Sequence, residues 1–295
     1  MSFQPLTPRG AAFLRVLLNK YHKGSPDALL RRLPQQEEAL VQATHTATAD
    51  VRAAGLDPAQ ELASIHFSWL QPFVESFSDA IRPVVIASLT DHQAAGLRSL
   101  LRIGDQRQPP STLYRKYLLT ELYRRFRDPG VMPFGLLPET PMHFLAHYIK
   151  RQLTQLVDFL GLYDLADEIR RTVDTSHLKT VFGALNPAQR EFLRSCLHIK
   201  SRLASPKLRL EKWRGNPAQL MVLLHRRGLA RLGKALCGQS PDFMWHLTHI
   251  LDTGRGDILK QYWTNQEIAG ITPVLQTQMQ AAANFLQLKR SDVSE

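Results

Sequence analysis

Apolar residues recur at intervals of three and four along most of the chain, and this period predicts amphipathic α-helices. In residues 111–127 the apolar positions with this spacing are Leu113, Tyr117, Leu118, Leu122 and Phe126. Strand-like alternation is nearly absent. Helix starts, which favour a capping residue before a proline, are predicted at Thr7-Pro8, Ser25-Pro26, Thr140-Pro141, Asn186-Pro187, Asn216-Pro217 and Ser240-Pro241. The pattern therefore predicts an all-α protein.

An internal repeat is visible when Leu89, Leu185 and Leu236 are aligned. Each of these leucines is preceded by apolar residues at the same offsets and is followed by a polar residue that can cap a further helix. The positions three, four, twelve and sixteen residues before them are apolar except Gly233: Phe73, Phe77, Val85 and Ile86; Ile169, Val173, Val181 and Phe182; Leu220, Leu224 and Leu232. We expect each set to be buried together.

Each repeat unit is thus interpreted as a helix of about three turns, a shorter helix and a capped third helix, the cap being Thr90, Asn186 or Ser240. Units of this kind stack in armadillo-like proteins, where each repeat buries its apolar face against its neighbours. The predicted fold is an elongated array of armadillo-like three-helix repeats with right-handed superhelical stacking. Chance agreement among amphipathic helices is the alternative.

Glycine and proline cluster between residues 128 and 141, in the sequence DPGVMPFGLLPETP. Such a cluster interrupts helical periodicity, so residues 129–140 are predicted to be a linker. The linker would separate an N-terminal helical domain at 1–128, with one repeat at about 65–102, from a C-terminal helical domain at 141–290. Residues 291–295 are predicted to be a flexible tail.

Composition agrees with a globular protein, since 44% of the 295 residues are hydrophobic and 21% are charged. No apolar run approaches the roughly 20 residues that a membrane-spanning helix needs, and no secretory signal pattern is visible. Only Cys196 and Cys237 are present, which argues against a disulfide scaffold. A soluble, cytoplasmic protein is expected.

Charge is concentrated in one part of the chain. The formal net charge is +11, and residues 190–234 contain 12 Lys and Arg residues against Glu191 and Glu211. Because the apolar faces of the helices there must lie inside, the cations are expected to point outward. The candidate partner-binding residues are Lys207, Arg209, Lys212, Arg214, Arg226, Arg227, Arg231 and Arg255.

A basic patch can bind nucleic acid, anionic lipid or an acidic protein surface, or it can be a solvated helix face. Nucleic-acid modules usually add a recognition motif or an aromatic platform, and only Trp213 lies close to this segment. Binding to an acidic protein surface is therefore the preferred interpretation, and nucleic-acid binding is the alternative.

Metal-binding and nucleophilic patterns are incomplete. His246 and His249 are three residues apart, but no second ligand pair accompanies them, and zinc needs about four convergent ligands. They are interpreted as histidines at the edge of the core. Cys196 and His198 are neighbours in sequence only, so Cys196 is interpreted as a buried structural thiol.

Phosphate-binding and catalytic motifs are equally incomplete. Residues 252–256, DTGRG, lack the Gly-Lys-Ser/Thr element of a phosphate-binding loop and are interpreted as a helix-to-helix turn capped by Asp252 or Thr253. No paired carboxylates or Ser/His/Asp series stand in a catalytic setting. We therefore expect no enzyme activity, cofactor or metal; an enzyme with a dispersed site is the weakest alternative.

From Asn216 onward the chain resembles the C-terminal armadillo-like domain of the flagellar motor switch protein FliG. The resemblance is carried by LARLGKALCGQSPDF at 229–243, LDTGRGDILKQYW at 251–263 and ITPVLQTQMQAAANFLQ at 271–287. It covers about a quarter of the chain and implies an armadillo-like fold for this part. It is a pattern of helix ends and apolar positions and contains no catalytic residues.

The charges by which that family generates torque are missing here, because the aligned positions are Cys237, Gly254, Gln261 and Tyr262. The resemblance therefore implies a scaffold or adaptor. The whole chain looks similar to a chlamydial type III secretion protein of the SctK-like, FliG-like kind, a sorting-platform or C-ring-like component peripheral at the inner membrane. The partners that this resemblance implies are the cytoplasmic tail of a membrane-ring protein and a C-ring-like secretion component.

Overall fold

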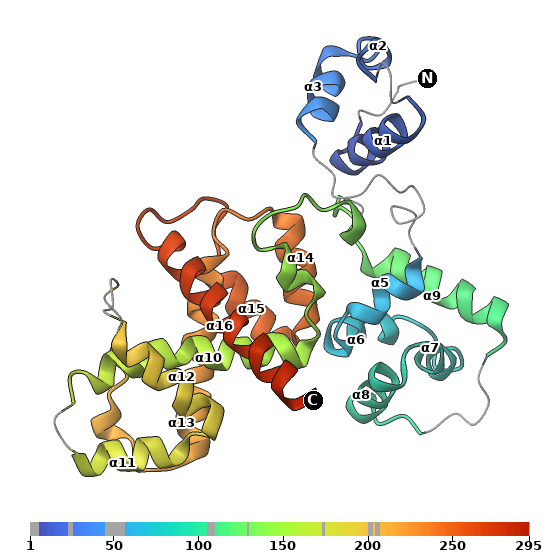
Figure 1. Cartoon of the computed structure of the whole chain (residues 1–295). Coiled ribbons are helices and arrows are strands. Elements are labelled where there is room, and N and C mark those ends of the chain that lie inside the picture. The colour runs from blue at the N-terminus through green and yellow to red at the C-terminus, as the bar shows by residue number, and fades with distance from the viewer. Residues whose placement is uncertain are drawn as a thin grey trace. The chain divides into compact units, whose positions relative to one another are not determined.

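A computed structural model describes residues 6–22, 26–44, 57–104, 110–128, 130–172, 175–199, 203 and 207–294. These residues form fifteen α-helices and three short 3-10 helices, and no strand occurs among them. The prediction of an all-α protein is confirmed (Figure 1).

The chain divides into two compact units. Unit 1 comprises Met1–His147 and Pro241–Thr253, and unit 2 comprises Tyr148–Ser240 and Gly254–Glu295. The helices of unit 1 are α1 (Pro8–Tyr21), α2 (Pro26–Leu30), α3 (Gln35–Ala43), α5 (Pro58–Ser64), α6 (Phe67–Glu75), α7 (Arg82–Ser88), α8 (Asp91–Leu101), α9 (Thr112–Phe126), η1 (Phe134–Leu136), η2 (His143–His147) and α14 (Pro241–Ile250). Unit 2 contains α10 (Lys150–Ile169), α11 (Thr175–Ala184), α12 (Pro187–His198), η3 (Leu210–Lys212), α13 (Pro217–Ala235), α15 (Thr253–Tyr262), which begins at the last residue of unit 1, and α16 (Thr272–Ser294).

The composition of these units differs from the sequence-based division at 129–140. The compact units separate at Tyr148, and α14 joins unit 1 although it lies far along the chain. The segment expected to be a linker contains η1 and buries Leu136 and Leu137. The linker prediction rested on the glycine and proline content of this segment and did not consider its apolar side chains, most of which are buried. At the other end, α16 continues through Ser294 and includes most of the expected 291–295 tail.

The main core of unit 1 lies among α5, α6, α7, α8 and α9 (Figure 1). α14 is fixed to this core by long-range contacts: Trp69 Nε1 donates a hydrogen bond to the carbonyl oxygen of Leu251 at 2.8 Å, and the Trp69 ring lies 4.5 Å from that of His249. Trp245 packs against the same core. Aromatic side chains that bury a large area and also donate a hydrogen bond are well suited to join distant segments.

The segment of the first predicted repeat unit contains three helices, α6, α7 and α8. Leu89 ends α7, and Thr90 caps α8 in a reciprocal capping box with Gln93. The amide of Gln93 also donates to the carbonyl oxygens of Leu62 and Ile65, both at 2.7 Å. Gln93 therefore satisfies carbonyl groups at the C-terminal end of α5 as well as the start of its own helix, and it links α5 to α8.

The predicted apolar face of α9 is only partly correct. Leu118, Leu122 and Phe126 are buried, but Leu113 is 82% exposed and Tyr117 is 62% exposed. Only the C-terminal half of α9 packs on the core. The spacing of apolar residues therefore predicted the helix correctly, but it did not show how much of the helix is buried. The predicted start at Thr140-Pro141 also differs, because no α-helix begins there and the 3-10 helix η2 follows at His143–His147.

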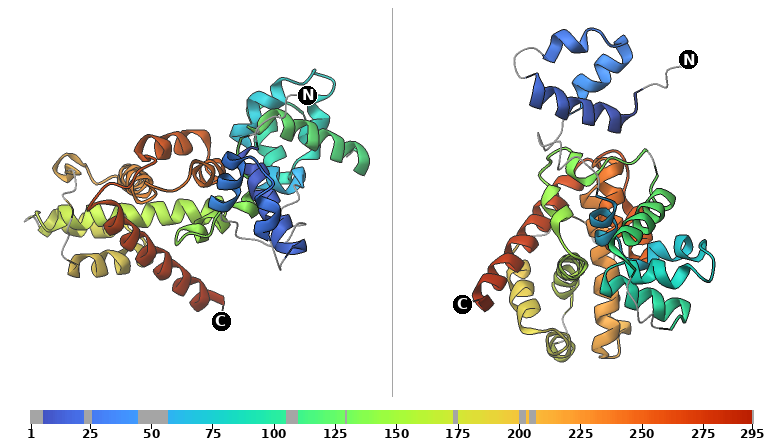
Figure 2. Two further views of the ribbon diagram at one scale, coloured as in Figure 1. Left: turned by 90° about the horizontal axis from the view of Figure 1, so that it is seen from above. Right: turned by 90° about the vertical axis from the view of Figure 1, so that its right-hand side faces the viewer.

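In unit 2 the helices α10 and α13 pack with their backbones in close approach. A Cβ atom on Gly161 of α10 would collide with the carbonyl oxygen of Leu224, and one on Gly228 of α13 would collide with that of Val157. Glycine at both crossing points allows this approach. α12 and α16 also pack on α10, and the red helix α16 crosses it obliquely (Figures 1 and 2).

The second predicted repeat unit also has three helices, α10, α11 and α12, with Asn186 and Gln189 forming the capping box of α12. Leu185, Val181 and Ile169 are buried, and Phe182 is partly buried. Val173 lies outside the described residues.

The third unit differs from the prediction. Leu220, Leu224, Leu232 and Leu236 are all buried, but α13 is one continuous helix from Pro217 to Ala235. At 1.5 Å per residue, Leu220 and Leu232 are about 18 Å apart along this helix, so the third unit has one long helix where the prediction had two shorter ones. Gly228 and Gly233 do not break the helix, because its packing on α10 outweighs their low helix propensity.

Candidate protein-binding surface

The basic segment before α13 is held against unit 2 by alternate residues. Leu208 and Leu210 are buried, whereas Lys207 and Arg209 beside them are exposed. The backbone N–H of Leu208 donates to Glu168 Oε2 at 3.2 Å. Arg209 adopts a left-handed conformation with φ of 55°, which turns the chain into η3. The leucines therefore fix the backbone, and the cations between them face solvent.

The exposed cations continue through η3. Lys212 and Arg214 are exposed on either side of Trp213, which is partly buried and donates from Nε1 to the carbonyl oxygen of Asn216 at 2.8 Å. Asn216 caps α13. We call Lys207, Arg209, Lys212 and Arg214 the cationic strip. Its residues were all predicted as partner-binding candidates, and the structure places them on one short segment with an ordered backbone.

The three candidate arginines of α13 point in different directions, because successive helical residues are rotated by about 100°. Arg226 is exposed. Arg227 is partly buried, and its Nη2 donates to the carbonyl oxygen of Lys207 at 2.9 Å. Arg227 therefore adjoins the beginning of the cationic strip, whereas Arg226 faces solvent away from the α10 contact.

Arg231 is a correction to the sequence-based set of exposed cations. Its side chain is buried, and Nε donates to Asp164 Oδ1 at 2.8 Å. Nη2 also bonds to Asp164, and Nη1 donates to Gln278 Oε1. A buried charge needs such partners. Asp164 lies 67 residues earlier, on α10, so no local pattern reveals that Arg231 faces inward.

Further polar groups surround this ion pair. Arg170 donates to Asp167 Oδ1 at 2.5 Å and to the carbonyl oxygen of Cys196 at 2.6 Å. Burial raises the pKa of Cys196 to about 12. Its thiol is therefore protonated at neutral pH and is a poor nucleophile. The interpretation of Cys196 as a buried thiol is confirmed.

Arg255 lies in a separate polar group that joins α10, α13 and α15. Its Nε donates to His225 Nε2 at 2.8 Å, and His225 Nδ1 lies 2.6 Å from Asp158 Oδ1. This arrangement requires the His225 tautomer with hydrogen on Nδ1. His225 therefore connects Arg255 to Asp158 through its two ring nitrogens. Positions 225 and 227 are about 200° apart around α13, so Arg255 does not adjoin Arg227.

The histidines considered as metal ligands are core residues of unit 1. His246 Nε2 hydrogen-bonds to the carbonyl oxygen of Met132 at 2.8 Å, and His249 Nδ1 to that of Trp245 at 2.6 Å. Both side chains are buried, as the sequence analysis expected. Burial lowers the pKa of His246 to about 4. Among the described residues, no group of three His, Cys, Asp or Glu side chains is arranged to hold a metal ion.

The interpretation of DTGRG as a turn between helices is only partly correct, because Leu251 and Asp252 connect α14 to α15 whereas Thr253–Gly256 form the first turn of α15. None of the described helices combines the length and apolar character needed to cross a membrane. Comparisons of the chain with family models, curated proteins and solved structures found no match.

Proposed function

We propose that this protein is a non-enzymatic adaptor that binds an acidic surface of another protein through the cationic strip of unit 2. The supporting observation is the alternation of buried leucines with exposed cations in 207–210. Because the backbone is held by Leu208 and Leu210, it loses little conformational freedom on binding. A preorganised charged surface favours fast association with an oppositely charged partner.

The fold proposed to present this surface is an armadillo-like stack of three-helix units, in which α6–α8 and α10–α12 are two repeats. Both sets end in a helix whose start is capped by a reciprocal capping box. Together with the resemblance to FliG, this supports the proposal that the protein acts in a type III secretion apparatus, as a sorting-platform or C-ring-like component. The proposed partners there are a membrane-ring cytoplasmic tail and a C-ring-like component, with the adaptor in the cytoplasm at the inner membrane.

The proposal is tested by reversing Lys207, Lys212 and Arg214 to Glu in the full chain. The matched control reverses Lys116, Arg151 and Lys260, which are exposed cations outside the strip, so both variants lose the same net charge. Partners are captured from the native organism at several salt concentrations and quantified by mass spectrometry. We expect the strip variant to lose partner capture and the control to retain it. Salt screens charges that lie far from the contact, so only cations close to the acidic groups of the partner contribute to binding.

The nucleic-acid alternative is measured on the same preparations with labelled random oligonucleotides. Binding through the strip to phosphates would fall log-linearly with salt, at about 0.7 to 0.9 units of slope per phosphate neutralised. Tight oligonucleotide binding by the wild type that is lost in the strip variant, together with unchanged protein capture, would overturn the adaptor proposal. Circular dichroism on all three proteins verifies that they remain folded.

A further inference from the structure

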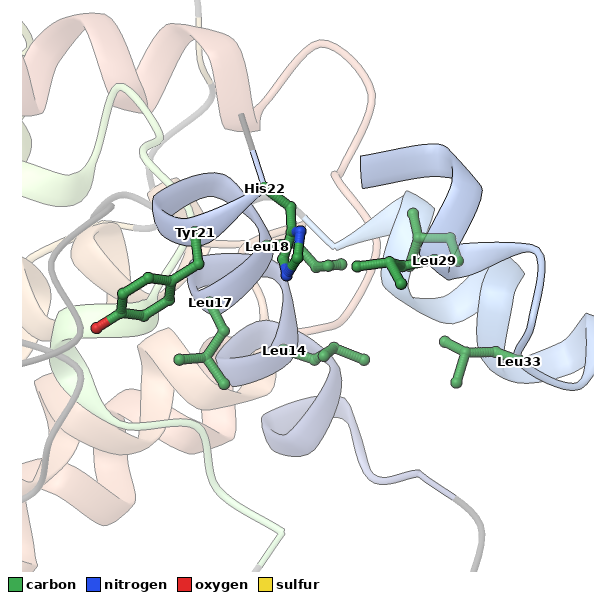
Figure 3. Close-up of a pocket in the computed structure, with 8 residues that line it drawn as sticks. Leu14, Leu17, Leu18, Tyr21, His22, Leu29 and Leu33 are labelled. Atoms are coloured by element: carbon green, nitrogen blue, oxygen red, sulfur yellow. The ribbon is translucent and has the colours of Figure 1, made fainter. Parts of the chain in front are cut away.

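Helices α1 and α2 and the turn after α2 line an apolar groove of about 490 Å³. One wall is the stripe of α1 at positions 14, 17, 18 and 21, and the other is formed by α2 and the turn after it. Figure 3 shows Leu14 facing Leu33 and Leu18 facing Leu29 across the groove. The lining side chains that carry the argument are Leu14, Leu17, Leu18, Tyr21, Leu29 and Leu33.

Helices α1, α2 and α3 have a small core of their own. Among the described residues, Ala11, Leu18, Leu30 and Val41 form its buried cluster, while Leu14, Leu29 and Leu33 are partly buried against it. A core of so few residues buries little apolar surface and contributes little stability by itself. Covering the groove would remove the half-exposed leucines from water, at about 25 cal/mol per Å² of apolar area. The core is therefore of a kind that a further helix would complete.

The shape and chemistry of the groove favour a helix over a small molecule. Its α1 wall has the i, i+3, i+4, i+7 spacing by which helices pack on one another. Small-molecule sites need several placed polar groups to fix the ligand. Here the polar lining side chains, Tyr21 and His22, lie together at the end of α1.

The charge around the groove selects the type of helix. α1 contains Arg9, Arg15 and Lys20 and no acidic residue. Arg31 and Arg32 are exposed between lining residues. Glu37 and Glu38 of α3 are not among the lining residues, and they accept hydrogen bonds from the Leu6 N–H and the Gln42 amide. The sequence of α2 adds one acidic residue, Asp27. A positive rim repels a second copy of α1 and attracts carboxylates.

We propose that this groove binds an amphipathic α-helix of another protein whose apolar stripe is flanked by Asp and Glu. The apolar stripe would fill the space between α1 and α2, and the acidic flanks would lie beside Arg31 and Arg32. This site is separate from the cationic strip, so the proposal stands whether or not the strip binds a protein.

The test uses a labelled synthetic helix of about 18 residues, or five turns, with Leu at i, i+3, i+4 and i+7 positions and Glu on both flanks. A second peptide has Lys in place of Glu. Fluorescence anisotropy with the full chain should show saturable binding of the Glu peptide and much weaker binding of the Lys peptide. The variant Leu17→Asp should weaken the Glu peptide at least about tenfold, and Leu113→Asp, at an exposed leucine of α9, should not.

A second variant removes any dependence on the folding of Leu17→Asp. Arg31→Glu combined with Arg32→Glu changes exposed residues only. It should lower the affinity for the Glu peptide and raise the affinity for the Lys peptide. Equal binding of both peptides would contradict the proposal that the partner helix has acidic flanks. The absence of saturable binding of the Glu peptide would contradict the proposal that the groove binds a helix. Sedimentation of the chain alone gives a further check: a dimer that Leu17→Asp abolishes would assign the groove to a second copy and also overturn the proposal.

Discussion

Arg231 and Asp164 form a buried ion pair that links α13 to α10, with the Arg231 Nε 2.8 Å from Asp164 Oδ1. Asp167 Oδ2 lies 3.9 Å from the same guanidinium. The Arg231 guanidinium therefore lies close to two buried carboxylates, and it also donates a hydrogen bond to Gln278 Oε1. The pair removes Arg231 from the protein surface and makes it part of the core of unit 2.

Arg231→Met should destabilise the protein by up to about 3 to 5 kcal/mol, the cost of removing one partner of a buried ion pair. This cost is an upper bound, because Asp164 keeps Arg227 at 3.7 Å and Asp167 keeps Arg170 at 2.5 Å. Asp164→Leu added to Arg231→Met should recover much of that loss, since an apolar pair needs no charge compensation. Urea unfolding followed by circular dichroism measures both. An unchanged midpoint for Arg231→Met would contradict the structural role.

The crossing of α10 and α13 should tolerate no side chain at either glycine. Gly161→Ala and Gly228→Ala are each expected to destabilise by about 1 to 3 kcal/mol, because the added methyl group forces the backbones apart. Gly183→Ala is the matched control: a Cβ there meets nothing within 4 Å, so it should be neutral or stabilise by up to about 1 kcal/mol. Thermal unfolding of the three variants distinguishes these effects, and equal behaviour would argue against close helix packing.

The leucines that end the predicted repeat helices should carry core stability. Leu185 is 2% exposed and Leu236 is 0% exposed, so Leu→Ala at either position should cost about 2 to 5 kcal/mol. Val222→Ala, at a residue 71% exposed on α13, should change stability by less than about 0.5 kcal/mol. Chemical denaturation provides the comparison, and a small effect at Leu236 would count against its burial.

His246 should make unit 1 sensitive to acid. Its pKa is lowered from 6.5 to about 4 by burial, so the unfolded chain takes up a proton at a higher pH than the folded one. Its contribution to stability is present above pH 6.5 and is lost as the pH falls through 4. The loss between pH 7 and pH 4 is on the order of 3 kcal/mol.

His246→Gln tests this dependence, because glutamine can still donate a hydrogen bond to the Met132 carbonyl oxygen but does not titrate. Unfolding free energies of the wild type and the variant should converge as the pH falls from 7 to 4. The other buried histidine, His249, serves as a control through His249→Gln. Parallel pH profiles for the wild type and His246→Gln would show that His246 does not cause the acid sensitivity.

Local sequence patterns determined the helices and much of the core. Thr90, Asn186 and Asn216 cap the helices that follow them, and Leu89, Leu185 and Leu236 are buried. Capping bonds and helical periodicity join residues a few positions apart, so a short stretch of sequence contains the whole interaction. The four residues of the cationic strip could also be identified in this way, since they alternate with apolar residues or flank Trp213.

Tertiary packing decided the rest. The inward direction of Arg231 depends on Asp164, and the membership of α14 in unit 1 depends on Trp69, whose bond to Leu251 spans 182 residues. The continuity of α13 through Gly228 depends on its contact with α10. Each of these contacts joins residues far apart in the chain. It stabilises the fold only after both helices have packed against each other, so a short stretch of sequence does not reveal it. The groove of α1 and α2 was likewise not predictable, because its apolar stripe has the same spacing as a stripe that a folded core covers.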